Sequence, residues 1–159
     1  MMVHPVLAAA VLLLGLAATP FAKEPAVTSH SATGPFDVKL VPQTLSPEAE
    51  HSGLGRMSLY KQFHGALEAT STGEMIAFRS AVAGSAGYVA METVRGMLDG
   101  RAGSFVLQHS ATLARGEPTQ SITVVPDSGA DALAGLAGRM VIDIAPGGAH
   151  SYRLEYTLP

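Results

Sequence analysis

The chain has 159 residues, of which 47% are hydrophobic and 14% charged, and its formal net charge is −3. This length corresponds to roughly one domain, which can bury a core without covalent cross-links. The chain has no cysteine, which excludes disulfides, thiolate metal ligands and a cysteine nucleophile. Its Lys and Arg residues are scattered rather than clustered, so we expect no nucleic-acid partner.

The N-terminus, residues 1–22, is predicted to be a signal peptide. An uninterrupted apolar run, Val6–Ala18, is followed by Thr19-Pro20-Phe21-Ala22 before the first charged residue, Lys23. This run is shorter than the ~20 residues that a transmembrane helix needs, and its pattern is typical of secretory signals. We therefore expect cleavage after Ala22 and a periplasmic or secreted protein that is not attached to the membrane. An uncleaved N-terminal anchor is the alternative.

The segment 23–34 (KEPAVTSHSATG) is small, polar and without periodicity. Such a composition favours a disordered tether between the signal and the folded part. The sequence thus predicts one folded domain over residues 35–159.

The folded part opens with a weakly patterned group of strands. Phe36, Val38 and Leu40 alternate with polar residues, which predicts a half-buried strand ending at Pro42. Two further candidates, 56–63 and 66–79, flank a turn at His64-Gly65.

Two features of this first group can be interpreted further. Gly73 is a possible bulge in the long second candidate, 66–79. If His64-Gly65 is a tight turn, Lys61 faces Glu68 as an exposed cross-strand ion pair.

An Asp99-Gly100 pair between two alternating segments predicts a tight hairpin. A type I′ turn requires positive φ at both central residues, which this pair accommodates. Glu92 then lies opposite Leu107, and Ala90 lies opposite His109. One face collects most of the large apolar side chains and is assigned to the interior. Its members are Tyr88, Ala90, Glu92, Val94, Phe105, Leu107, His109 and Leu113.

The remaining segments complete an all-β chain. A four-residue loop, Arg115–Pro118, would place His109 opposite Val124 in the next strand. Residues 130–138 form either a short helical turn or an apolar loop that caps the barrel, and two more strands follow at 140–144 and 152–158. The total of about eight strands predicts a single antiparallel, mostly meander β-barrel, because closure removes unpaired edges. A barrel of this size is either filled by side chains or holds one small ligand.

Several runs together resemble an uncharacterised bacterial family of small β-barrel proteins, a domain of unknown function. The resemblance extends over about residues 35–158 and implies a barrel whose fold is grouped with that of allene oxide cyclase. It does not imply cyclase activity, because the family has no settled function. The runs that carry the resemblance are Gly84–Gly103, Ser104–Ser110, Thr123–Gly129, Leu133–Met140 and His150-Ser151-Tyr152.

Glu92 and His109 are the candidate catalytic pair, with Tyr88 as a possible third member. The predicted register makes Glu92 and His109 diagonal neighbours inside the barrel, ~7–8 Å apart at the backbone. Burial raises the pKa of a carboxyl group and a nearby imidazolium lowers it, so the pair could transfer protons near neutral pH. The alternative, which we favour, is that the two groups only satisfy each other in a structural core.

The other polar candidates have simpler explanations. His64 and His150 lack partners at metal-ligand spacing and are interpreted as surface imidazoles, so no metal and no cofactor is predicted. Asp127 and Ser128 fit a turn better than a hydrolase site, because both residues favour turns through local hydrogen bonds.

Three functions remain open. The barrel could bind a small apolar or amphipathic ligand, which we rank first. It could be an isomerase-like or cyclase-like enzyme that uses Glu92 and His109. It could also be a structural envelope protein with a filled barrel. A partly empty interior would favour the first of these.

Overall fold

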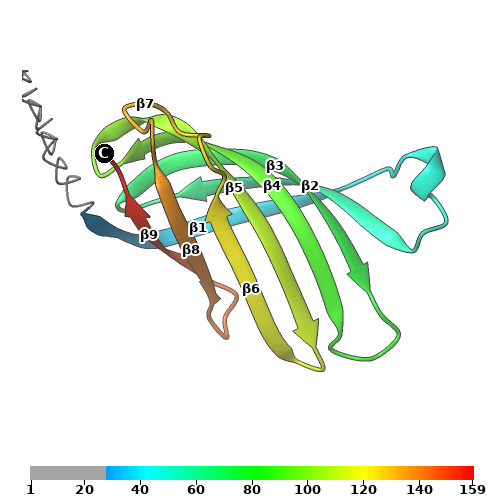
Figure 1. The fold of residues 1–159 in the computed structure, drawn as a ribbon. Helices are drawn as coiled ribbons and strands as arrows, with labels where there is room; N and C mark the ends of the chain where they lie inside the picture. Colours follow the sequence, from blue (N-terminus) through cyan, green and yellow to red (C-terminus); the bar gives the residue numbers. More distant parts are fainter. Residues whose placement is uncertain (1–27) are drawn as a thin grey trace, which may run out of the picture.

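Eight long antiparallel strands close into a barrel in the computed structural model, which describes residues 28–159 (Figure 1). Around the barrel, β1, β2, β3, β4, β5, β6, β8 and β9 follow one another, and β9 pairs with β1. The predicted signal peptide, 1–22, lies outside the described residues. The bounds are β1 Ser29–Gln43, β2 Leu54–Phe63, β3 Leu67–Arg79, β4 Ala86–Leu98, β5 Arg101–Ala114, β6 Glu117–Val124, β7 Ala130–Asp131, β8 Ala137–Ile144 and β9 His150–Thr157, with a 3-10 turn η1 at Pro47–Ala49.

The predicted all-β barrel is confirmed, and one short strand is added to it. The two-residue β7 pairs with β5 outside the closed barrel. From residue 28 onward, no helix has the length and hydropathy that crossing a bilayer requires.

The predicted register of the β4–β5 hairpin is confirmed. Asp99 and Gly100 have φ values of 46° and 79°, and Leu98 pairs with Arg101. Ala90 consequently lies opposite His109, as the turn chemistry predicts. The interior face is also as predicted, because residues alternate between buried and exposed along β4.

The predicted β5–β6 loop is wrong by two residues. Arg115 and Gly116 alone form the turn, with φ values of 52° and 97°, and Pro118 is a strand residue opposite Leu113. His109 therefore faces Ile122 instead of Val124. The error leaves the interior face unchanged, because a shift of two residues preserves the alternation of a strand.

The predicted tether is wrong for residues 29–34. These residues form the first part of β1, where Ser29 pairs with Thr157 and Gly34 pairs with Tyr152. Backbone pairing with β9 orders this segment although its side chains carry no apolar pattern. The domain therefore begins before the predicted boundary at Pro35.

Gly73 is not at a bulge, since it pairs in an unbroken ladder with Leu59 on β2 and Glu92 on β4. A Cβ atom at this position would lie 2.1 Å from the Met91 carbonyl oxygen and 2.7 Å from Glu92 Cα. The glycine is therefore needed for the close approach of β3 to β4, directly beside Glu92.

One end of the barrel is filled by apolar side chains, and we call it the plugged end. Phe63, Leu98 and Phe105 are at most 1% exposed there. Leu133 and Leu136, from the loop between β7 and β8, join the same core, so this segment is the capping loop and not a helical turn. The β3–β4 and β5–β6 connections lie at the opposite end, which we call the open end (Figure 1).

Candidate functional site

Four polar side chains meet inside the barrel in a buried cluster. Glu92 accepts hydrogen bonds from Lys61 Nζ at 2.6 Å and His109 Nε2 at 2.7 Å, both on Oε1, and from Ser71 Oγ at 2.5 Å on Oε2. Glu92 is 1% exposed and His109 is 3% exposed. We call Lys61, Ser71, Glu92 and His109 the polar cluster.

The strands place these groups together because each faces inward at neighbouring positions. Lys61 on β2 pairs with Ser71 on β3, and Gly73 on β3 pairs with Glu92 on β4. The Lys61 ammonium reaches across β3 to the carboxylate. The Lys61 ammonium also lies 5.4 Å from the ring centre of Phe36.

Glu92 is ionised in this cluster. Burial alone would raise the pKa of its carboxyl group, but the His109 hydrogen bond and the Lys61 charge more than offset this and lower it from 4.5 to about 2. The cluster thus holds a neutralised pair of opposite charges in the barrel interior.

The predicted contact between Glu92 and His109 is therefore present, but the role of Lys61 was predicted wrongly. Lys61 is buried, pairs with Ser71 rather than facing Glu68, and binds Glu92. The sequence contains a signal for its burial, because Lys61 lies two residues from both Leu59 and Phe63 and therefore shares their inward face of β2. Ser71, also missed, follows Leu67 and Ala69 in the same way on β3.

A cavity of about 700 Å³ occupies the open end of the barrel. The cavity is not filled by side chains, because two inward-facing residues of its lining, Leu40 and Ile144, remain 47% and 64% exposed. Every barrel strand except β9 contributes to its lining, including Leu40, Met57, Met75, Tyr88, Ala111, Gln120 and Ile142.

Tyr88, the third predicted site residue, lines this cavity, whereas Glu92 does not. Burial and then the charge of Glu92 raise the pKa of the Tyr88 hydroxyl, so it stays protonated at neutral pH. The structure thus brings Glu92 and His109 into contact and places Tyr88 toward the open end. Catalysis by these three residues stays a prediction.

β6 and β8 share few backbone pairs. Backbone pairing is limited to Ile122 with Met140 and Thr123 with Arg139. The Gln120 side chain continues the contact, accepting from the Ile142 amide at 3.0 Å and donating to the Ile142 carbonyl at 2.8 Å. The amide group of Gln120 therefore bonds to the backbone of β8 and extends the contact between the two strands.

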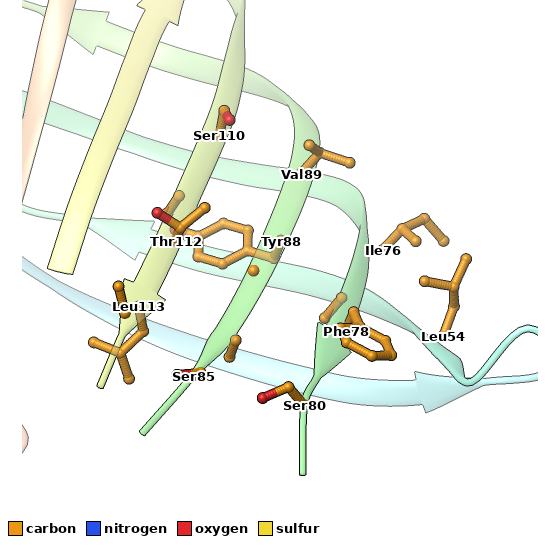
Figure 2. A pocket seen from close by; sticks show the side chains of 15 residues that line it. Leu54, Ile76, Phe78, Ser80, Ser85, Tyr88, Val89, Ser110, Thr112 and Leu113 are labelled. Atoms are coloured by element: carbon orange, nitrogen blue, oxygen red, sulfur yellow. The ribbon is translucent and has the colours of Figure 1, made fainter. Parts of the chain in front are cut away.

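A second hollow of about 580 Å³ lies along the open-end parts of β3, β4 and β5 (Figure 2). Its lining includes outward-facing residues such as Ile76, Val89 and Ser110. Its lining residues come only from β2 to β5 and the connection between β3 and β4, so this hollow lies along one side of the barrel. The 700 Å³ cavity is therefore the better candidate site.

The remaining predicted polar residues have structural contacts. Ser128 Oγ donates to the Val125 carbonyl at 2.7 Å and accepts from the Val106 amide at 3.1 Å, which confirms its role in a turn. His64 is at the β2–β3 connection, 3.7 Å from the Glu68 carboxylate, with its side chain 46% exposed. His150 packs against Phe36, with ring centres 5.1 Å apart. Within residues 28–159 no three side chains are grouped as metal ligands.

Comparison with known proteins places these features in a family. Residues 32–156 match the family described as "Protein of unknown function (DUF3224)". A solved structure of a protein of unknown function from the same family, from Shewanella oneidensis MR-1, is 47% identical, with a TM-score of 0.77 over 83% of this chain and 98% of that one. No curated protein matches the chain. The further grouping with allene oxide cyclase stays a prediction.

Proposed function

The chain belongs to the DUF3224 family of proteins of unknown function, and we propose that it binds a small apolar or amphipathic molecule in the open half of its barrel. The observation that carries the proposal is the unfilled interior at that end. Leu40 and Ile144 point inward yet remain 47% and 64% exposed, around a cavity of about 700 Å³. Ligand pockets are typically concave, mostly apolar and about 300–1,000 Å³ in volume.

The chemistry of the lining supports an apolar ligand body. Most lining residues are apolar, and Met57 and Met75 can adapt to irregular shapes. Arg79, at the end of β3, is a charged member of the lining and suits a ligand with a polar end, whereas Glu92 is paired, 1% exposed and outside the lining.

The two alternative functions have less support from the same features. A structural protein with a filled barrel requires packing at both ends, and only the plugged end has it. An enzyme using Glu92 and His109 requires these groups to reach substrate, and neither contributes to the cavity lining. Binding therefore has the better support.

Export is part of the proposal. It is supported by the apolar run Val6–Ala18 and the uncharged segment that follows it. The ligand would then be met in the periplasm or outside the cell.

Binding can be tested with N-phenyl-1-naphthylamine, an apolar dye whose fluorescence rises in apolar surroundings. We expect saturable binding of one dye per chain. Ala111→Phe should abolish it, because Ala111 lines the cavity from the open-end part of β5. Ser121→Phe on the outer face of β6 is the matched control and should bind normally.

Two outcomes contradict the proposal: absence of saturable binding, or equal binding by the Ala111→Phe and Ser121→Phe variants. Native mass spectrometry of the protein from its own host adds an independent check. We expect a retained small molecule that is lost in Ala111→Phe.

A further inference from the structure

Arg79 places a charged group at the mouth of the open-end cavity. It is the last residue of β3, beside the β3–β4 connection at the open end (Figure 1). Along β3 it lies two residues from Ala77 and four from Met75, which also line the cavity, so the strand period places all three on the inward face. Among the lining residues that the structure describes, Arg79 alone carries a charge.

This charge is not neutralised by the protein. Arg79 has no ion-pair partner within residues 28–159, whereas Arg56 pairs with Glu74 and Lys61 pairs with Glu92. A guanidinium group stays protonated in proteins and presents several N–H donors in one plane. A positive charge is therefore available to a ligand at the edge of a mostly apolar cavity.

The other polar side chains of the lining leave donors rather than acceptors for a ligand. The hydroxyl groups of Thr112 and Thr119 hydrogen bond to each other at 2.7 Å, and the Gln120 amide bonds to the backbone of β8. The Tyr88 hydroxyl is protonated at neutral pH and can donate. No Asp or Glu between residues 28 and 159 contributes to the lining, so nothing there repels a negative charge at short range.

We propose that the ligand is an amphipathic organic monoanion, with a carboxylate or a similar singly charged oxyanion group against the Arg79 guanidinium and its apolar body in the cavity. This inference rests on the proposed function and adds the charge of the ligand. One cation matches one negative charge, and the planar guanidinium fits an oxyanion through two parallel hydrogen bonds. The chain has a net charge of −3, so a preference for anions must arise locally.

Two dyes with the same ring body test this preference. N-phenyl-1-naphthylamine is neutral, and 8-anilinonaphthalene-1-sulfonate carries one added sulfonate. We expect Arg79→Gln to weaken binding of the sulfonate dye by about five- to tenfold, which lies between the effects of an exposed ion pair and of a buried hydrogen bond to a charged group. Binding of the neutral dye should not change. Arg95→Gln is the matched control, because it removes the same charge from an exposed position of β4 outside the cavity lining.

Ala111→Phe shows where the sulfonate dye binds, and we expect it to abolish saturable binding of this dye as well. Three results would overturn the anion assignment while the neutral dye still supports the proposed function. The sulfonate dye could bind wild type no better than Arg79→Gln, it could be weakened equally by Arg79→Gln and Arg95→Gln, or it could still bind to Ala111→Phe. If neither dye binds saturably, the proposed function and the anion assignment are both overturned.

Discussion

Removing the charge of Glu92 should destabilise the barrel strongly. Glu92→Gln keeps the shape of the side chain but leaves Lys61, whose side chain is 7% exposed, without a counter-charge. The fall of the Glu92 pKa from 4.5 to about 2 corresponds to about 3 kcal/mol in favour of the ionised form. Breaking one side of a buried ion pair costs about 3–5 kcal/mol in other proteins, in agreement with this value.

The partner change, Lys61→Met, should cost less. It leaves the carboxylate with two hydrogen-bond donors, Ser71 and His109. The double variant, Glu92→Gln with Lys61→Met, has no unpaired buried charge. We therefore expect its loss of stability to be smaller than the sum of the single losses by about 1–3 kcal/mol.

The assay is guanidinium unfolding at pH 7 and 25 °C, followed by far-ultraviolet circular dichroism. Glu74→Gln on β3 is the control, because Glu74 is also in an ion pair, with Arg56 at 2.8 Å, but both side chains are more than 40% exposed. Solvent screens such a pair, so the control should be close to wild type. The reasoning is refuted if Glu92→Gln behaves like Glu74→Gln, or if the effects of Glu92→Gln and Lys61→Met are strictly additive.

Three further predictions concern the pH dependence of stability, the β4–β5 turn and the N-terminus. Because the pKa of Glu92 is lowered in the folded state, its contribution to the free energy of unfolding is complete above about pH 4.5 and is lost as the pH falls toward 2. Unfolding measured at a series of acid pH values should therefore show a smaller loss of stability in Glu92→Gln than in wild type. Parallel curves for the two proteins would contradict the ionised state of Glu92. Gly100→Val should lower the free energy of unfolding by about 1–3 kcal/mol, because valine is strained at a φ of 79°. Gly147→Val is the control, since an added Cβ meets no atom within 4 Å at either position and Gly147 does not have a positive φ. Equal stability of the two variants in thermal unfolding would argue against strain. The exported fraction should contain a chain whose intact mass begins near Lys23, and a membrane-bound chain that retains residues 1–22 would disprove cleavage.

The register and the inward face of β4 and β5 could be predicted from residues that are close together in the sequence. Asp99-Gly100 sets the β4–β5 register because few residue pairs adopt positive φ at two successive positions, and this information lies in adjacent residues. Alternation along β4 and β5 assigned the inward face for a similar reason, since a strand repeats every two residues. The Glu92–His109 contact could therefore be predicted from one hairpin.

Turn length was less certain where two signals competed. Proline at position 118 favoured a longer loop, yet Arg115-Gly116 turns the chain and Pro118 pairs with Leu113. The predicted inward face of β6 is still correct, because the error in turn length shifts the pairing by two residues, which is the period of a strand.

The tertiary structure alone decided what joins the predicted pair and what the barrel leaves empty. Lys61 reaches Glu92 across β3, 31 residues along the chain, next to Gly73, whose missing side chain lets β3 and β4 approach closely. Residues 29–34 become a strand because β9 supplies backbone partners from the other end of the chain. The cavity depends on the volumes of side chains from seven strands taken together, and no segment of the sequence encodes that sum. Most strands, their inward faces and one hairpin register could be predicted because they depend on neighbouring residues, whereas the charge network and the empty volume exist only after the barrel has closed.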